Sequence, residues 1–363
     1  MADTELVSHD GLVVCACGGQ EYSARDAIEA ALYRGELEAK WRDFLHRVAA
    51  EKKADESDME LDEDAIDSAA EAFRYQHDLI TAEETEQWLA ARGLSLDDFA
   101  DYFARQYCGN TLTDDFAAEE VDFLDAPDGL RQLFAAEVLL SNDIDWMITR
   151  LSWRLAAAAA AKEAISAEDL AAECKRFFER TGLEPEQWPR WLEKMGHDSE
   201  WFDRMVQMEA AYRGRSETLV TPQTRKRELA QLRLPLTRFE AEMLELESRD
   251  AANEALFCVR EDGVSMEDVA TEGRYPYRRI SFLHEDLPEE LQQRFLTVSA
   301  GDVLEPLPRG DGFELYRIMQ KIEPNEKDSD IQERVENIIL GRHFSELAAR
   351  YVEPRLRAVS VSQ

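Results

Sequence analysis

The sequence predicts an α+β protein that is predominantly α-helical, and three observations carry this prediction. Apolar residues recur at helical spacing through most of the first 220 residues. An aromatic motif occurs twice in that region. After residue 221, short alternating stretches and a hairpin signal stand between shorter helices, which predicts a small sheet in the last third.

Length and charge restrict the class of protein. The chain has 363 residues, 44% of them hydrophobic, which is enough for two or three cores. Its 42 basic and 77 acidic residues give a net charge of −35, and this field repels phosphate backbones, so we expect no nucleic-acid partner. We also expect no membrane span, since no apolar run is long enough. The beginning of the chain lacks the pattern of a secretory signal, which favours a cytoplasmic location.

The sequence offers no clear cofactor or metal site. Five scattered cysteines argue against a disulfide framework, and Cys15 and Cys17 form a pair without a second pair or a nearby histidine to complete a zinc site. The six histidines have no metal or catalytic spacing, and no phosphate-binding glycine motif occurs. We therefore expect neither a metal nor a cofactor.

Within the first 67 residues, an apolar stretch that begins at Leu12 predicts a strand. Leu12 to Cys17 is followed by Gly18-Gly19, which predicts a turn, and Ser23 then resembles a helix cap. The spacing of apolar residues predicts a helix over 24–53. The acidic run over 54–67 predicts an exposed loop.

An internal repeat is the most informative feature of the helical part. The pattern W-L-x-x-x-G-x-x-x-x-x-F begins at Trp88 and again at Trp191, offset by 103 residues at all four positions. Each copy predicts a helix that presents the Trp-Leu pair, a stop at glycine and another helix that carries the Phe. We expect two three-helix modules with the cores Trp88, Leu89, Phe99 and Trp191, Leu192, Phe202, and a cradle between the modules. Residues 139–166, between the copies, predict one long helix.

The last third predicts a different kind of domain. The order is an alternating stretch over 236–248, two helices, a short apolar stretch, the helix LPEELQQRFLTV and two strands joined by Asp311-Gly312, a strong hairpin signal. A basic stretch with Arg225, Lys226, Arg227 and Arg233 precedes it, and a long amphipathic helix follows over 328–356. We expect helical modules at 1–110 and 111–220, the mixed domain at 221–325, and a terminal helix at 326–363 that packs on the helical region.

The segments GVSMEDVA, LPEELQQRFLTVSAGDVLEPL and GFELYRI follow one another within residues 235–323. With them, this part of the chain resembles a parvulin (PpiC-type) peptidyl-prolyl isomerase domain. GVSMEDVA resembles the glycine turn of that family, LPEELQQRFLTVSAGDVLEPL its helix and following strand, and GFELYRI its final strand. The resemblance implies a parvulin-like α/β domain with a peptide-binding pocket. It places Met243 and Glu314 where the family has its two pocket histidines, and Leu287, Leu291, Phe295 and Tyr316 complete the pocket.

Helical parts around such a domain resemble SurA- and PrsA-type chaperones, and the segment at 73–99 resembles a PpiC-related group associated with peptide maturation and export. The resemblance implies a peptide-binding chaperone or accessory factor. Its partners would be an unfolded or extended polypeptide, such as a precursor peptide or export client, and a modification enzyme or transporter.

Two alternatives to a chaperone without activity stay open. Isomerisation of a prolyl bond needs relief of amide resonance but no nucleophile, so an isomerase with a divergent pocket is one of them. Because both histidines are missing, and a buried carboxylate at Glu314 would repel negative charge on the imide carbonyl, we assign no catalytic residue. The other alternative is a structural subunit whose pocket is filled by a partner segment.

Overall fold

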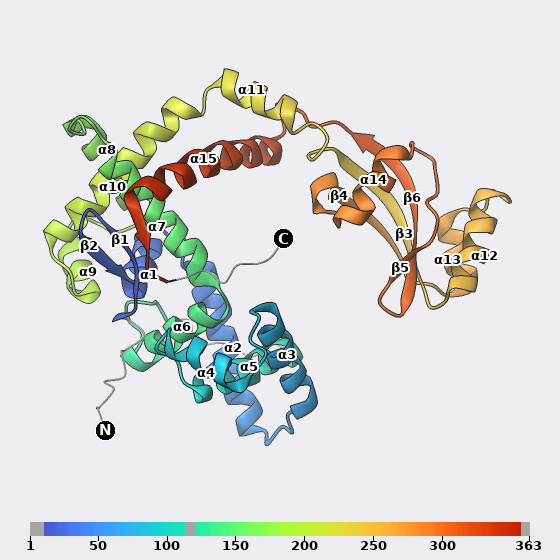
Figure 1. The fold of residues 1–363 in the computed structure, drawn as a ribbon, viewed down its shortest axis with the longest axis horizontal. Coiled ribbons are helices and arrows are strands. Elements are labelled where there is room, and N and C mark those ends of the chain that lie inside the picture. Colours follow the sequence, from blue (N-terminus) through green and yellow to red (C-terminus); the bar gives the residue numbers. More distant parts are fainter. Residues whose placement is uncertain (1–10, 113–120, 357–363) are drawn as a thin grey trace. The chain divides into compact units, whose positions relative to one another are not determined.

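The computed structural model describes residues 11–112 and 121–356. Its ribbon is shown in Figure 1. The predicted class is confirmed, because helices predominate and the strands form two small antiparallel sheets. The chain divides into two compact units, residues 1–217 with 342–363 and residues 218–341, and each is described by itself. This division is coarser than the four parts expected from the sequence, whose boundaries stay predictions.

The first unit contains a three-stranded sheet that joins the two ends of the described chain. β1 (Val13–Cys17) pairs with β2 (Gln20–Ser23) on one side and with β7 (Val352–Pro354) on the other. Gly18 and Gly19 have φ values of 60° and 85° in the turn between β1 and β2, a conformation that glycine adopts without strain. β7, in red, lies beside β1, in blue (Figure 1).

The helices of the first unit begin and end at other residues than the sequence predicts. The single helix expected over 24–53 is two helices, since the chain turns at Gly35 with φ 68°. The acidic loop expected over 54–67 is shorter, because its ends are helical. The helix expected over 139–166 is interrupted by Asn142 in the left-handed conformation, with φ 61°, and ends at Ala159. These helices are α1 (Ala24–Tyr33), α2 (Glu38–Glu56), α3 (Glu63–Gln76), α4 (Ala82–Ala90), α5 (Leu96–Thr111), α6 (Asp128–Leu140), α7 (Asp143–Ala159), α8 (Ala167–Thr181), α9 (Trp188–Met195) and α10 (Ser199–Leu219).

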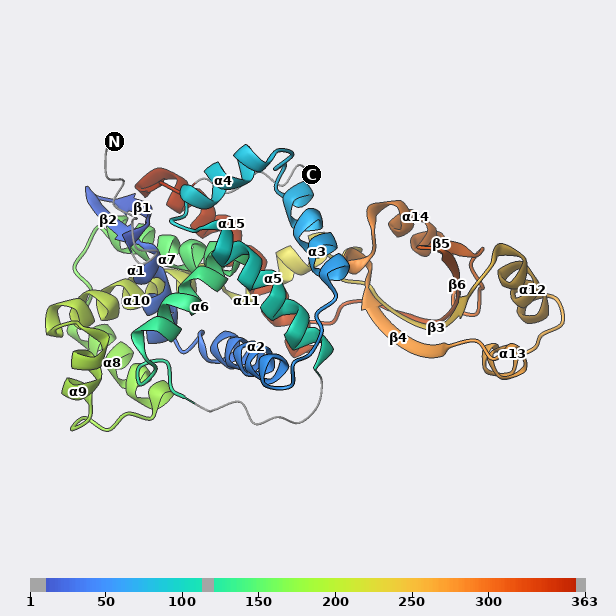
Figure 2. The same ribbon diagram turned by 90° about the horizontal axis from the view of Figure 1, so that it is seen from below.

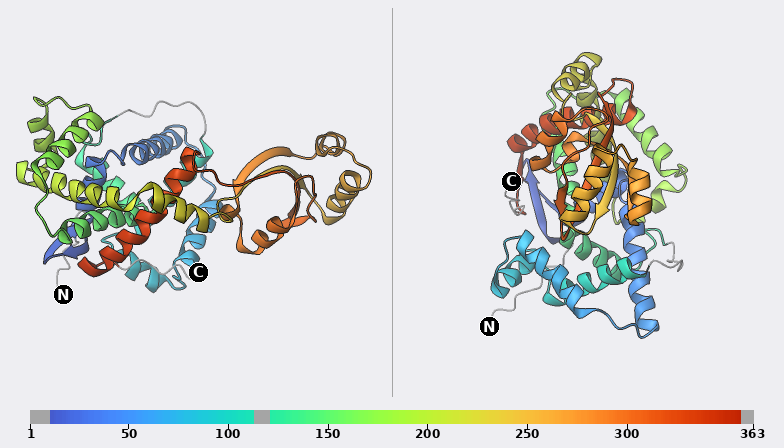
Figure 3. Two further views of the ribbon diagram at one scale, coloured as in Figure 1. Left: turned by 90° about the horizontal axis from the view of Figure 1, so that it is seen from above. Right: turned by 90° about the vertical axis from the view of Figure 1, so that its right-hand side faces the viewer.

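Each copy of the repeat spans three helices. The first copy is α3–α5 and the second is α8–α10, and the two groups occupy separate places in Figure 3. Capping boxes at Thr81 and Ser95 start α4 and α5. In the second copy, Gly182 and Gly196 end α8 and α9 in the left-handed conformation.

The terminal helix α15 (Ser329–Tyr351) contributes its last turns to the first unit. Phe344 is fully buried, with its ring 4.4 Å from that of Tyr212 and 6.1 Å from that of Trp153. Arg215 donates a hydrogen bond of 2.9 Å to His343 Nε2. This part of α15 therefore packs on α7 and α10.

The second unit is built around a four-stranded antiparallel sheet. Its strands are β3 (Arg238–Leu246), β4 (Tyr277–Leu283), β5 (Leu307–Arg309) and β6 (Gly312–Ile322), in the order β4-β3-β6-β5. This is the order of elements implied by the parvulin resemblance. The predicted hairpin is present, and its two-residue turn is Gly310-Asp311, because Arg309 pairs with Gly312. β5 is shorter than the predicted strand, and Val303 forms an isolated bridge to Arg317. The unit also holds α11 (Pro222–Gln231), α12 (Arg249–Arg260), α13 (Met266–Gly273), the 3-10 turn η2 (His284–Asp286), α14 (Glu289–Thr297) and the first turns of α15.

The two faces of this sheet have separate cores. α12 and α13 cover one face, where Leu244, Leu246 and Leu315 are buried. α14 covers the other, called here the α14 face, where Phe239, Met243 and Tyr316 are buried. Figure 2 shows α14 on the opposite side of the strands from α12 and α13. Strand residues alternate between the faces, as the twofold period of a strand requires.

No helix in the described part of the chain is long and apolar enough to cross a membrane.

Candidate peptide-binding site

The structure brings the six residues of the predicted pocket together on the α14 face. Met243 lies on β3, directly opposite Tyr316 of β6, and Glu314 precedes Tyr316 by two residues on the same side of the strand. Leu291 and Phe295 lie on α14, and Leu287 lies just before it. All except Glu314 belong to one apolar cluster with Phe239, Ala241, Leu304, Leu307 and Ile318.

Phe295 occupies the centre of this cluster. Its side chain is fully buried, and its ring is edge-on to those of Phe239, Phe282 and Tyr316, with centroids 5.7, 5.4 and 5.4 Å away. Edge-to-face packing of this kind is favourable beyond the area that it buries. The centre of the site is therefore a filled core rather than an open pocket.

Around that centre lies a ring of half-buried apolar side chains, called here the apolar rim. These side chains pack against the cluster but stay partly exposed, so they offer apolar surface that an extended polypeptide can cover. The rim consists of Ile280, Phe282, Leu287, Leu291 and Val298.

Two polar side chains fix α14 over the sheet. His284 Nε2 lies 3.0 Å from the carbonyl oxygen of Gln292 and donates to it, because a carbonyl oxygen can only accept. Lys321 Nζ donates a 3.0 Å hydrogen bond to the carbonyl oxygen of Leu296. His284 is buried and its ring lies 6.3 Å from that of Phe239. This histidine therefore supports the site by holding the helix.

Glu314 is a buried carboxylate with two partners. The Tyr316 hydroxyl donates a hydrogen bond of 2.6 Å to Glu314 Oε2, and the Arg309 guanidinium forms an ion pair with Oε1. Burial, followed by the hydrogen bond to Glu314, raises the pKa of Tyr316 well above its ordinary value. The hydrogen bond to Glu314 also raises the pKa of Arg309. The negative charge expected to oppose a bound imide is therefore neutralised within the site.

A second ion pair lies on the same face beside Met243. Glu245 lies opposite Glu314 in the ladder, and Arg278 lies opposite Met243. Arg278 Nη2 and Glu245 Oε1 are 3.1 Å apart. Arg278 and Arg309 were not among the site residues predicted from the sequence. Arg309 directly precedes the turn at Gly310-Asp311, so its contact with Glu314 across the turn could have been foreseen from the hairpin signal.

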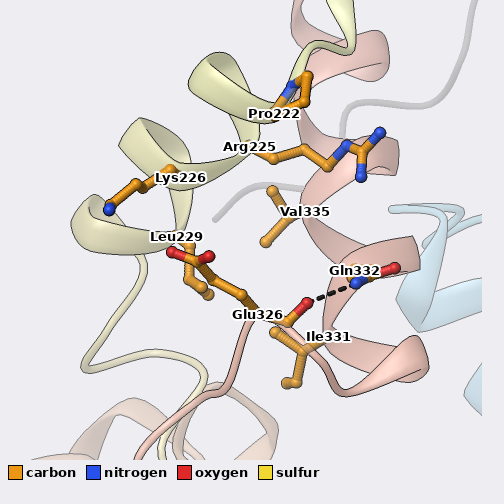
Figure 4. A pocket seen from close by; sticks show the side chains of 8 residues that line it. All are labelled: Pro222, Arg225, Lys226, Leu229, Glu326, Ile331, Gln332 and Val335. Carbon is orange, nitrogen blue, oxygen red and sulfur yellow. Dashed lines mark hydrogen bonds between the residues drawn. The ribbon is translucent and has the colours of Figure 1, made fainter.

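The basic stretch before β3 is partly neutralised within the second unit. Arg225 forms an ion pair of 3.2 Å with Glu336, and Arg233 pairs with Glu323. Arg225 and Lys226 also border a hollow of about 190 Å³ between α11 and the start of α15 (Figure 4). Its apolar lining includes Leu229 from α11 and Ile331 and Val335 from α15. This hollow is far smaller than a typical ligand pocket.

The repeat residues occupy equivalent places in their two modules. In the first copy the Phe73 ring is edge-on to Trp88 and Phe99, with both centroids 5.4 Å away. In the second copy Phe177 is edge-on to Trp191 at 5.2 Å and to Phe202 at 5.0 Å. Leu89 and Leu192 are buried, whereas Trp191 is partly exposed. The structure therefore gathers these residues into aromatic cores.

The second copy differs by an inserted side chain. Tyr33 of α1 stacks on Phe177 with ring centroids 4.8 Å apart. Burial, then the nearby Glu209 and Glu173 carboxylates, raise the pKa of Tyr33. No sequence signal connected α1 with this module, because the contact spans more than 140 residues.

The predicted cysteine pair lies on β1. Cys15 is buried and Cys17 is partly buried, and burial raises the pKa of Cys15 to about 11. Burial also raises the pKa of Cys17, so both thiols are held in the protonated form. No group of three or more metal-binding side chains occurs within residues 11–112 and 121–356.

Comparison with known proteins gives structural similarities alone. No family model matches the sequence, and no curated protein matches it. A peptidylprolyl isomerase structure, PrsA from Bacillus anthracis, is 14% identical, with 56% of this chain and 96% of that chain covered and a TM-score of 0.34. PrsA from Bacillus cereus is 10% identical, with 59% and 85% covered and a TM-score of 0.35. A SurA-like chaperone structure from Campylobacter jejuni is 11% identical, with 60% and 89% covered and a TM-score of 0.20.

Proposed function

We propose that this protein is a peptide-binding folding chaperone or accessory factor, related to parvulin-type isomerases, that acts on an extended precursor or exported polypeptide. The observation that carries the proposal is the α14 face, where a closed aromatic centre is surrounded by the apolar rim. A half-buried rim of this kind gains free energy when another chain covers it.

The shape of the site favours an extended client over a compact ligand. Phe295 fills the centre, so the accessible apolar surface is the shallow ring formed by residues such as Phe282 and Leu291. A shallow surface contacts successive side chains of an extended segment, whereas a small ligand needs a deep cavity. The ion pairs of Arg278 and Arg309 border this surface and leave it without a large net charge.

The net charge and the sequence indicate the type of client and the location that we propose. A net charge of −35 keeps the protein soluble while it holds an apolar client, and it favours clients with basic residues. We propose a cytoplasmic location, with a modification enzyme or transporter as the partner that receives the client.

Isomerase activity is the second candidate, and one observation favours it. The barrier to prolyl rotation is about 20 kcal/mol, and an apolar surface can lower it by binding the twisted imide. A bare carboxylate would oppose this. The charge of Glu314, however, is paired with Arg309 and stabilised by a hydrogen bond from the Tyr316 hydroxyl, so the electrostatic objection is weaker than the sequence indicated.

Peptide binding by the full-length protein tests the proposal. Fluorescence anisotropy with a library of labelled, extended peptides should find binders with Kd below ~1 mM. Leu291→Ser should weaken them, because it removes apolar rim surface. Leu296→Ser is the matched control, since Leu296 lies on the same helix, is 36% exposed and is outside the cluster. Equal binding by both variants would contradict the assignment of the site.

A protease-coupled assay on proline-containing peptides separates the two candidates. Binding without acceleration of isomerisation supports the chaperone, and acceleration that is lost in Leu291→Ser supports the isomerase.

A further inference from the structure

β4 is an edge strand, and its register shows which backbone groups face outward. The pairing with β3 is unbroken from Arg238–Leu283 to Leu244–Tyr277. Beyond its two ends, the Glu245 amide donates to Pro276 O at 3.0 Å and the His284 amide donates to Thr237 O at 2.9 Å. Both are directly opposed pairs of the hydrogen-bonded type.

In an antiparallel ladder, hydrogen-bonded pairs alternate with pairs that do not exchange bonds. Counting inward from Pro276 and from His284 gives the same result. Arg278, Ile280 and Phe282 therefore bond to β3. The N–H and C=O groups of Tyr277, Arg279 and Ser281 point away from the sheet. The next outward amide, that of Leu283, donates to the Asp286 carboxylate at 3.0 Å and so closes one end of this edge.

The two edges of the sheet differ in their protection. No strand of the described chain pairs with the outer side of β4, which runs for seven residues without a proline. The opposite edge, β5, has three residues and carries Pro308, which cannot donate a backbone hydrogen bond. Short edges and edge prolines block strand addition. β4 is therefore the edge that can accept a further strand.

The side chains of β4 connect this edge with the apolar rim. Ile280 and Phe282 lie opposite Ala241 and Phe239, so they belong to the α14 face, and both are half-buried rim residues. A strand added to β4 would place every second side chain on the same face, beside Ile280 and Phe282. It would bury rim surface while it satisfies the outward backbone groups.

The charged side chains of β4 restrict which residues an added strand can carry opposite them. The Arg278 and Arg279 side chains are 64% and 72% exposed; the carboxylate partner of Arg278 is Glu245, and those of Arg279 are Glu242 and Glu267. Basic side chains opposite these arginines would be repelled, whereas acidic or neutral ones would be accepted.

We propose that the client binds by strand addition to β4. The occupant is an extended polypeptide segment with apolar residues opposite Ile280 and Phe282 and an acidic or neutral residue opposite Arg279. Its backbone pairs with the outward groups of Arg279 and Ser281. This inference rests on the proposed function and specifies how the same site recognises its client.

Ser281→Pro in the full-length protein tests the inference. It deletes one outward N–H and leaves the bonds to β3 unchanged, so peptide affinity should fall about three- to tenfold, the effect of one lost hydrogen bond. Ser281→Ala is the matched control, because it removes the hydroxyl and keeps the amide, and it should bind as the unmodified protein does. Circular dichroism shows whether both variants are folded.

The peptide provides an independent arm that needs no folded variant. For an antiparallel client, N-methylation of the residues opposite Arg279 and Ser281 should abolish pairing, whereas N-methylation of the residue opposite Ile280 should be tolerated; for a parallel client the two sets of positions exchange. A scan along the best-binding peptide should therefore show an effect at every second residue. An effect with this period supports strand addition.

Two results overturn the inference and differ from each other. If the protein binds peptides but Ser281→Pro and N-methylation have no periodic effect, strand addition is wrong and the proposed function stands. If the unmodified protein binds no peptide, both are wrong.

Discussion

The Tyr316 hydroxyl donates a hydrogen bond of 2.6 Å to Glu314 Oε2, and both side chains are buried on the α14 face. With Arg309 as the second partner, this bond lets a carboxylate lie beside an apolar cluster, at the position where the parvulin resemblance places a histidine. A buried carboxylate without such partners would destabilise the fold.

Removal of the Tyr316 hydroxyl should destabilise the second unit. In Tyr316→Phe, Glu314 loses a buried donor and keeps Arg309. We expect the free energy of unfolding to fall by about 1–3 kcal/mol. Urea unfolding followed by circular dichroism measures this. An unchanged midpoint would show that the bond contributes little.

Stability should also depend on Tyr316 at alkaline pH. Its pKa is raised in the folded state by burial and by Glu314, so folding favours the protonated phenol. The contribution is fully present below the ordinary pKa of 10.0 and is lost as the pH rises through the folded value. The stability difference between the unmodified protein and Tyr316→Phe should therefore shrink above pH 10. Other tyrosines with raised pKa values are common to both proteins and cancel. A constant difference from pH 8 to 11 would refute this linkage.

Phe295 should be essential to the α14 core. Phe295→Ala removes a fully buried ring with three edge-to-face neighbours, and truncations of this kind cost about 3–5 kcal/mol. Leu296→Ala, at the exposed neighbouring position, should cost far less.

The tryptophans provide a further control for Phe295→Ala. All seven precede residue 218, so their fluorescence reports on the first unit. During urea unfolding, Phe295→Ala should lower the midpoint of the transition of the second unit seen by circular dichroism. It should leave the midpoint followed by tryptophan fluorescence unchanged. A lower urea midpoint in the tryptophan fluorescence would mean that the two units unfold together.

The two repeat copies should respond alike to equivalent substitutions. Phe99→Ala and Phe202→Ala each remove a buried ring from an aromatic core and should each lower stability by about 3–5 kcal/mol. Tyr75→Ala, at a side chain that is 62% exposed, should change stability by less than about 0.5 kcal/mol. Tryptophan fluorescence during urea unfolding follows all three. A large effect in one copy alone would argue against equivalent modules.

Local signals predicted much of the fold. The hairpin signalled by Asp311-Gly312, the caps at Ser23 and Thr81, and the spacing within each repeat copy depend on neighbouring residues. The structure has all of them, although the hairpin turn is Gly310-Asp311, one residue earlier than the signal. The pairing of β1 with β7 joins residues more than 330 positions apart, and no local pattern encodes it. The break at Asn142 was missed because one residue in the left-handed conformation interrupts an otherwise continuous helical pattern.

The candidate site, too, has features that the sequence predicts and features that only the structure shows. The resemblance grouped Met243, Phe295 and Tyr316, and the structure places all three on one face; their role as a peptide site stays a prediction. It did not show that Phe295 fills the centre, since side-chain packing depends on Phe239 and Phe282 from other strands. The partners of Glu314 also had to be seen in the structure, as did the outward groups of Ser281, which follow from the register.

Photo-crosslinking of a bound peptide to the full-length protein tests the central claim most directly. A benzophenone-labelled extended peptide, analysed by mass spectrometry, should form crosslinks that concentrate at the apolar rim, in particular at Phe282, Leu287 and Leu291. Crosslinks that concentrate on α12 and α13, or the absence of any saturable crosslink, would contradict the assignment of the α14 face as the client site.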